Sequence, residues 1–153
     1  MAVRGPLAHI DLSVGDPDRS IPFYAALLGA LGCRRVRSEH AEFAGERPRR
    51  ATWAVRHAGG AELAIEVRPA RPESRSQRCD RYAPGLHHLA FHAESRAAVD
   101  EIHARVAQAG GTVLDAPADY SGQDGYGEGY YAAFFADPDG AKLEVVHEPR
   151  TNP

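Results

Sequence analysis

The stretch LAHIDLSV, residues 7–14, decides the fold because it recurs in altered form as LHHLAFHA, residues 86–93. In each copy apolar and polar residues alternate, which is typical of a β-strand with one face on a core. In the first copy the apolar set is Ile10, Leu12 and Val14, and the opposite set is His9, Asp11 and Ser13. The second copy places His88 on its polar side. We therefore expect two matching strands, each with a histidine on the face turned away from the core.

The ends of the two halves match as well. GGAELAIEVRP, residues 59–69, resembles DGAKLEVVHEP, residues 139–149, at an offset of 80 residues. His9 and His88 are 79 residues apart. A nearly constant offset of this kind indicates a chain built from two similar structural units.

A helical pattern follows each of these strands. Apolar residues recur at helical spacing at Ile21, Tyr24, Leu27, Leu28 and Leu31, and again at Val99, Ile102, Val106 and Ala109. We expect the first helix to begin at Asp18 or Ser20 and to end at Gly32. Ser95 is the predicted N-cap of the second helix. We expect this helix to end at the two glycines of residues 110–111.

Two modules within a single domain, residues 1–153, account for these matches. The first module covers residues 6–68, and the second covers residues 84–148. The segment between them, residues 69–83, is rich in proline, arginine and serine, a composition typical of a flexible linker. A chain of this length is sufficient for one sizeable core.

The composition is that of an ordinary globular protein, with 43% hydrophobic and 25% charged residues. A net charge of −3 provides no basic field for nucleic acid, and we interpret Arg47, Arg49 and Arg50 as part of a solvated loop. No apolar run reaches the roughly 20 residues of a membrane span, and the first residues do not resemble a signal peptide. From the charge and the lack of a long apolar run, we expect a protein that binds neither nucleic acid nor membrane. Cys33 and Cys79 have no metal-ligand spacing, so we interpret them as incidental thiols of a reduced cytoplasmic protein.

Three residues with metal-binding side chains fall on the polar faces of the predicted strands. Glu144 lies between Leu143 and Val145, on the face opposite both. If the two modules pack around a pseudo-twofold axis, His9, His88 and Glu144 converge. Two imidazoles and a carboxylate, with open positions left over, suit divalent iron, manganese, nickel or zinc. The alternative is that both histidines are structural or exposed, as single histidines on strands usually are.

A family resemblance rests on two motifs. GLHHLAFHA, residues 85–93, is followed by a capped helix and then by YYAAFFADPDGAKLEVV, residues 130–146. Together they resemble the vicinal oxygen chelate superfamily, which includes glyoxalase I, fosfomycin-resistance proteins, bleomycin-binding proteins and extradiol dioxygenases. The resemblance covers nearly the whole chain. It implies an α+β fold in which two βαβββ modules form a cupped mixed sheet around a metal.

Carried over by position, the resemblance implies that His9 and His88 are matching first-strand ligands and that Glu144 is the last-strand ligand. Glyoxalase I has a carboxylate ligand on the last strand of each module, whereas Ala64 aligns with Glu144 here. We therefore expect three protein ligands rather than four. Glu62 and Glu66 lie two residues to either side of Ala64, where a register difference would bring one to the metal. Otherwise Glu66 is either the catalytic base or a solvated carboxylate.

Other residues leave alternatives open. Residues 119–131, DYSGQDGYGEGYY, are either a lid over the metal or an ordinary surface loop. His92 either lines a pocket or faces solvent, and Trp53 is interpreted as core or as lining of the cup. Extradiol dioxygenases have a tyrosine three residues before the Asp-Pro pair, where this chain has Phe134, so it is not expected to be a typical ring-cleaving enzyme.

The resemblance implies a metal-dependent enzyme that acts on a small oxygen-rich molecule. The metal would polarise a carbonyl or enediolate as a Lewis acid, and Glu66 would move the proton, in isomerase or lyase chemistry. An alternative from another class is a metal-free protein that sequesters an antibiotic. Dioxygenase or thiol-transfer chemistry of the same superfamily is a further alternative. Because related proteins often exchange modules between subunits, we expect a homodimer.

Overall fold

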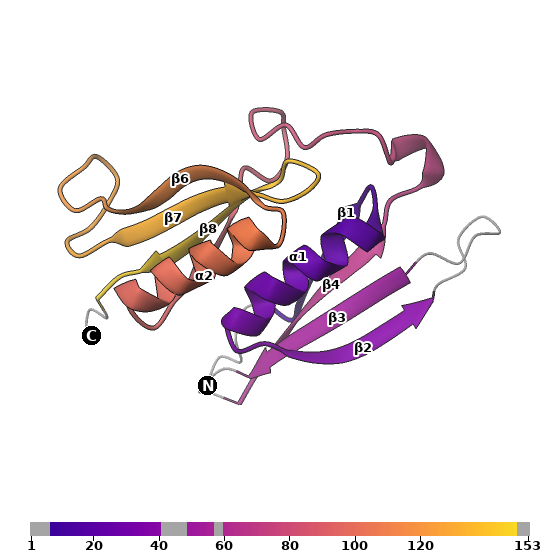
Figure 1. Ribbon diagram of the computed structural model, residues 1–153, viewed down its shortest axis with the longest axis horizontal. Coiled ribbons are helices and arrows are strands. Elements are labelled where there is room, and N and C mark those ends of the chain that lie inside the picture. The colour runs from indigo at the N-terminus through magenta and orange to yellow at the C-terminus, as the bar shows by residue number, and fades with distance from the viewer. Residues whose placement is uncertain (1–6, 41–48, 57–59, 150–153) are drawn as a thin grey trace. The chain divides into compact units, whose positions relative to one another are not determined.

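A computed structural model describes residues 7–40, 49–56 and 60–149, and it contains two compact units, Met1–Gln77 and Arg78–Pro153 (Figure 1). Along the chain, each unit has the order strand, helix, strand, strand, strand. The α+β class and the two βαβββ modules predicted from the sequence are thereby confirmed. Residue 6, where the first predicted module begins, lies outside the described residues.

The first unit is one helix on a four-stranded sheet. Its elements are β1 (His9–Val14), α1 (Pro17–Ala30), β2 (Arg34–His40), β3 (Arg49–Arg56) and β4 (Glu62–Pro69). The order across the sheet is β1-β4-β3-β2, with β1 parallel to β4 and the other pairs antiparallel. The parallel pair needs a long crossover between β1 and β4, and α1 lies in that crossover.

Helix α1 begins earlier than predicted. Asp16 is its N-cap, and the Asp16 side chain accepts a hydrogen bond from the backbone N–H of Asp18 at 2.9 Å. The predicted starts at Asp18 and Ser20 are therefore wrong, because Pro17 occupies the first helical position, where its missing N–H costs nothing. Gly32 follows the helix with a φ of +79°, as the predicted helix end requires.

The second unit repeats this arrangement. Its elements are β5 (Leu89–His92), α2 (Arg96–Gln108), β6 (Thr112–Asp119), β7 (Tyr131–Ala136) and β8 (Lys142–His147). The order across its sheet is β5-β8-β7-β6, with β5 parallel to β8. Ser95 caps α2 as predicted, since its Oγ accepts from the backbone N–H of Ala98 at 3.1 Å. The predicted linker contains a short 3₁₀ helix, Pro72–Ser74.

Each helix covers one face of its own sheet (Figure 1). The buried residues of α1 are Ser20, Ile21, Phe23, Tyr24, Leu27 and Leu28, and those of α2 are Val99, Ile102 and Val106. Trp53 is 2% exposed and belongs to the core of the first unit, one of the two positions predicted for it. The other face of each sheet is left for polar residues, which is where the candidate site residues lie.

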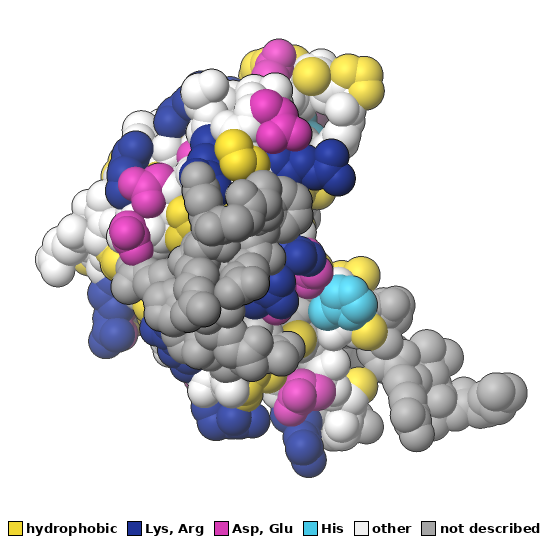
Figure 2. Space-filling view, turned by 90° about the vertical axis from the view of Figure 1, so that its right-hand side faces the viewer, with side chains coloured by type: hydrophobic (Ala, Val, Ile, Leu, Met, Phe, Trp, Pro, Cys, Tyr) yellow, Lys and Arg dark blue, Asp and Glu magenta, His cyan; other side chains and the backbone are white. Residues whose placement is uncertain are grey.

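Three observations concern the described residues as a whole. Among the described residues, no helix is long and apolar enough to cross a membrane. Basic and acidic side chains are interspersed over the described part of the face shown in Figure 2. Cys33 and Cys79 are both free thiols.

Candidate metal centre

Glu144, the acid of the predicted ligand set, is deeply buried. It lies on β8, between β5 and β7, directly opposite Ala90 on one side and Phe134 on the other. Its neighbours Leu143 and Val145 point to the helix side, so Glu144 points away from α2, as predicted. The residue is 2% exposed. A carboxylate buried to this degree is costly unless its charge is matched by partners.

Two side chains meet the Glu144 carboxylate, one at each oxygen. His88 places Nε2 3.1 Å from Oε2, and the phenol of Tyr130 donates a hydrogen bond to Oε1. Burial, followed by the contact with the Glu144 carboxylate, raises the pKa of Tyr130 far above its usual value. Tyr130 therefore remains a protonated donor, and the structure brings together His88 and Glu144, two of the three predicted ligands.

His88 is itself oriented by its neighbour in the chain. Nδ1 of His87 lies 2.7 Å from Nδ1 of His88, so one of these nitrogens donates to the other. Loss of hydration, with the positive charges of nearby groups including Lys142 and Arg81, lowers the pKa of His87. Neutral His87 can accept the hydrogen bond from Nδ1 of His88, which leaves Nε2 of His88 to face the Glu144 carboxylate.

An aromatic cluster stands beside Glu144. Tyr120, Tyr126, Tyr130 and Phe134 form a chain of ring contacts with centroid separations of 4.8 to 5.6 Å. The tyrosine-rich segment that supplies three of these rings is anchored at its base, since Tyr130 O accepts from the backbone N–H of Tyr120 at 2.8 Å. Ser121 Oγ accepts from the backbone N–H of Gly129, also at 2.8 Å. The segment therefore packs on the site face of its sheet, and its role as a lid stays a prediction.

The predicted match between Ala64 and Glu144 stays a prediction. In the antiparallel pairs, Ala54 lies opposite Ala64 in the first unit, and Phe134 lies opposite Glu144 in the second. Each residue of the second pair is offset by 80 from its counterpart. Thr52 lies opposite Glu66 in the same way, so the pairing is compatible with either Ala64 or Glu66 at the position of Glu144.

The predicted equivalence of His9 and His88 stays a prediction. In the parallel pairs, Asp11 lies opposite Glu66, and Ala90 lies opposite Glu144. His9 is two residues before Asp11, and His88 is two residues before Ala90, so each histidine has the same position relative to a glutamate of the neighbouring strand. Asp16 and Ser95 also each cap a helix seven residues after a histidine. The register is therefore compatible with the predicted equivalence.

His9 itself is exposed, on the face of β1 opposite the core-facing Ile10 and Leu12. The alternation predicted for this strand is therefore present. Within either unit, no three His, Cys, Asp or Glu side chains of the described residues come together as a group able to hold a metal. His92, whose side chain is 77% exposed, faces solvent and lies 3.8 Å from Glu148.

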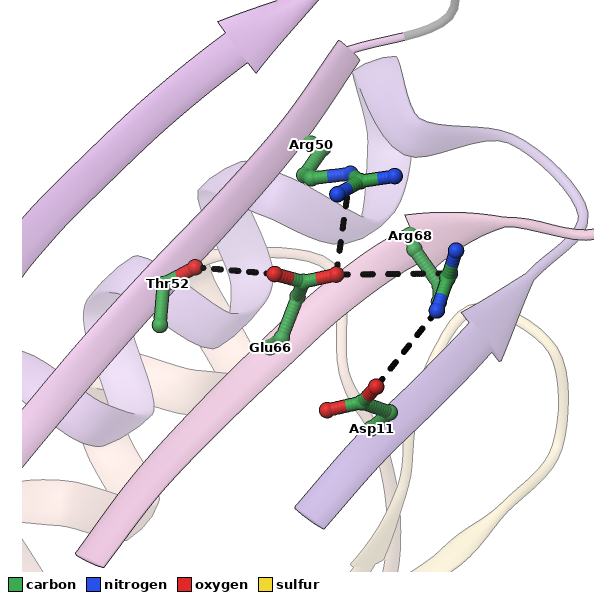
Figure 3. A network of polar contacts seen from close by, with 5 residues as sticks. All are labelled: Asp11, Arg50, Thr52, Glu66 and Arg68. Carbon is green, nitrogen blue, oxygen red and sulfur yellow. Dashed lines mark hydrogen bonds and ion pairs between the residues drawn. The ribbon is translucent and has the colours of Figure 1, made fainter. Parts of the chain in front are cut away.

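Glu66 lies in a polar cluster on the same face of the first sheet as His9 (Figure 3). Thr52 Oγ1 donates to Oε2 of Glu66 at 3.2 Å. The guanidinium groups of Arg50 and Arg68 approach Oε1 at 3.6 and 4.0 Å, and Arg68 Nη1 lies 3.4 Å from Oδ2 of Asp11. The Glu66 side chain is 14% exposed, so it is not a freely solvated carboxylate.

The solvated-loop interpretation of the arginines is corrected by this cluster. Arg49 and Arg50 belong to β3, and Arg50 is paired with Glu66; Arg47 lies outside the described residues. A run of arginines gives no periodic signal, so Arg49 and Arg50 were not recognised as the start of this strand. Tyr130 was also missed as a partner of Glu144, because it lies just before β7, outside the alternating pattern of that strand.

Two βαβββ modules, with a buried glutamate on the last strand and a histidine leading into the first strand of the same module, define a protein of the glyoxalase type. A family model for the Glyoxalase/Bleomycin resistance protein/Dioxygenase superfamily matches residues 7–145, and the chain belongs to this superfamily. Many members of this superfamily are enzymes, and many bind divalent metals.

Individual relatives agree with this membership. The chain is 29% identical over 140 residues to the uncharacterized protein YqjT of Bacillus subtilis, covering 90% of this chain and 95% of that one. A glyoxalase/bleomycin resistance protein from Albidiferax ferrireducens shares the fold with a TM-score of 0.63, at 24% identity, over 93% of this chain and 98% of that one. A glyoxalase-related enzyme from Fulvimarina pelagi also shares the fold, with a TM-score of 0.59 at 23% identity. The match covers 95% of this chain and 89% of that one.

Proposed function

We propose that this protein is a glyoxalase-like enzyme in which His9, His88 and Glu144 hold a divalent metal. The observation that supports it most strongly is the Glu144 carboxylate, which is 2% exposed and faces Nε2 of His88 at 3.1 Å. The chain keeps a charged group in a strand whose neighbouring residues are apolar. A bound dication would offset the cost of burying that charge.

The donor atoms of the second unit fit a metal ion. Two ligands about 2.1 Å from one ion and roughly at right angles are about 3.0 Å apart. The separation between His88 Nε2 and Glu144 Oε2 is 3.1 Å, close to this value. Tyr130 on the carboxylate and His87 on the imidazole are the kind of outer partners that orient ligands in metalloproteins. Zinc, nickel, manganese and iron all accept two imidazoles and a carboxylate.

A bound metal would act as a Lewis acid toward a carbonyl or enediolate oxygen of a small substrate. Glu66 is the proposed base. Its Oε2 accepts from Thr52, and its Oε1 faces two arginines at distances longer than a hydrogen bond, so Oε1 can exchange a loose ion pair for a substrate proton. The reaction class that follows is isomerisation or elimination next to a carbonyl group.

Metal content tests the proposal. Protein purified without chelators should contain close to one equivalent of a divalent transition metal, measured by mass spectrometry. Glu144→Ala should remove most of it, because it deletes the only charged ligand of the set. Glu144→Gln keeps the shape of the side chain and separates loss of ligation from loss of fold. His92→Ala is the matched control, since His92 lies four residues after His88, at the end of β5, with its side chain 77% exposed.

Full metal occupancy in Glu144→Gln would contradict the ligand assignment. Metal-free wild-type protein that binds a large antibiotic such as bleomycin would instead support the sequestering alternative. Size-exclusion chromatography with light scattering tests the proposed homodimer, and fractionation of the native cells tests the proposed cytoplasmic location.

A further inference from the structure

We infer that Arg50 and Arg68 form a binding site for the anionic group of the substrate, an oxyanion such as a carboxylate or phosphate. The two arginines flank Glu66 on the polar face of the first sheet (Figure 3). The inference names the substrate class for the proposed enzyme. It rests on that proposed function only for the statement that the bound anion is a substrate.

The two arginines are held in place by ion pairs with Glu66, and Arg68 also by a hydrogen bond to Asp11. Arg50 projects from β3 and Arg68 from β4, and both approach the same Glu66 oxygen, at 3.6 and 4.0 Å. These distances fit ion pairs but are longer than hydrogen bonds. Asp11 on β1 takes one hydrogen bond from Arg68 Nη1, at 3.4 Å. The carboxylates therefore position both guanidinium groups, and most of the N–H groups of the two arginines have no hydrogen bond to the described residues.

Arg50 provides the sharper sign of a missing partner. Its Nε is buried and lies 3.6 Å from Oε1 of Glu66, an ion-pair contact beyond hydrogen-bond distance, so this N–H has no hydrogen-bond partner among the described residues. A buried donor without a hydrogen bond is unfavourable, and a guanidinium group presents its N–H donors in a planar fork that matches an oxyanion. The Arg50 side chain is 22% exposed, so an anion at this fork would be partly shielded from water, where charge interactions are stronger.

The register of the first sheet places this fork near a proposed metal ligand. On β1, Asp11 lies opposite Glu66, and His9 lies opposite Ala64. The two β1 residues share a face and are about 7 Å apart along the strand. One small molecule could therefore present an anionic group to the arginines and an oxygen to a metal at His9. This spacing favours a short oxo acid or hydroxy acid, with the carbon next to its carbonyl close to Glu66.

The test is anion binding measured by two-dimensional NMR titration at low and high salt, in protein as purified and after dialysis against EDTA. The probes are pyruvate, inorganic phosphate and uncharged pyruvamide. Pyruvate and phosphate report which oxyanion is preferred, and pyruvamide removes the charge. Wild-type protein should bind at least one anion more than tenfold tighter than pyruvamide, and salt should weaken that binding.

Variants locate the site. Arg50→Met and Arg68→Met should each lower anion affinity at least tenfold. Arg56→Met is the matched control, because Arg56 lies on the same strand and face as Arg50 but opposite Glu62, and it should change affinity less than twofold. Arg50→Lys keeps the charge and loses the fork, so an intermediate affinity is expected. Glu66→Gln should raise affinity severalfold by removing a competing negative charge.

Equal anion affinity in wild type, Arg50→Lys and Arg68→Met would overturn the inference, as would equal binding of pyruvate and pyruvamide. The EDTA-treated protein separates this outcome from failure of the proposed function. Arginine-dependent binding without any metal would keep the anion site and reject the metal. Metal binding together with an anion affinity that does not depend on the arginines would keep the metal site and reject the anion site.

Discussion

Tyr130 and Glu144 are joined by a hydrogen bond in which the phenol donates to one oxygen of a nearly inaccessible carboxylate. Tyr130 lies just before β7, and its ring also packs against the ring of Tyr126. The carboxylate is therefore fixed from two directions, by this phenol and by His88 on its other oxygen. These two contacts set the orientation of the carboxylate.

Tyr130→Phe removes this hydrogen bond while keeping the ring. We expect a loss of about 1.5–3 kcal/mol in the free energy of unfolding, the range for a hydrogen bond to a charged group. If Glu144 is a metal ligand, metal affinity should fall roughly 10- to 100-fold as well. Denaturant titration and metal binding measure the two effects. Tyr126→Phe, which removes a hydroxyl with no hydrogen bond to described residues, should change neither by a comparable amount.

Glu66→Ala separates the base from the ligands. Metal content should stay intact, and exchange of solvent deuterium into the methyl group of pyruvate, followed by NMR, should slow by roughly 10²–10⁴-fold. The control is Glu62→Ala, which removes an exposed carboxylate four residues away on the same face. An unchanged exchange rate in Glu66→Ala would rule out Glu66 as the base. Loss of metal would instead make it a ligand.

Asp119 should make the start of the tyrosine-rich segment sensitive to acid. Its hydrogen bonds from Ser121, followed by its contact with Arg96, lower the pKa of Asp119 to about 2. A depressed pKa means that the stabilisation is present above the ordinary value near 4 and is lost as pH falls toward 2. Amide signals of Ser121 should therefore shift over this window. In Asp119→Asn the shift should disappear, and its persistence would assign it to another group.

The two N-caps should contribute equally to stability although only one was predicted. Ser95→Ala and Asp16→Ala each remove a side-chain acceptor for a backbone N–H at a helix start. Each should cost about 1 kcal/mol in denaturant unfolding. Ser13→Ala, on the exposed face of β1, should remain within about 0.5 kcal/mol of wild type. Costs below that value in both cap variants would show that tertiary packing alone holds the helices.

The fold was predictable because repetition and alternation are local signals. LAHIDLSV and LHHLAFHA carry the same strand pattern, and both precede a helical one, so the two modules followed from the sequence. The start of α1 was missed because three candidate caps lie within five residues, and only Pro17 decides among Asp16, Asp18 and Ser20.

The site was predictable only in part. The place of Glu144 followed from alternation along β8. The register between parallel strands has no such signal, since it depends on pairing between distant segments, so the pairing of His9 with Ala64 could not be predicted. Arg50, Arg68 and Tyr130 become neighbours of the carboxylates only through tertiary packing.

The pairing of His9 with Ala64 leaves the first module one mutational step from a second acidic position. Codons for alanine and glutamate differ by a single nucleotide, so one base change would place a carboxylate directly beside His9, as Glu144 stands beside Ala90. The duplicated halves have in this sense diverged in chemistry while keeping one backbone plan. One half retains the buried acid, and the other carries paired arginines around Glu66.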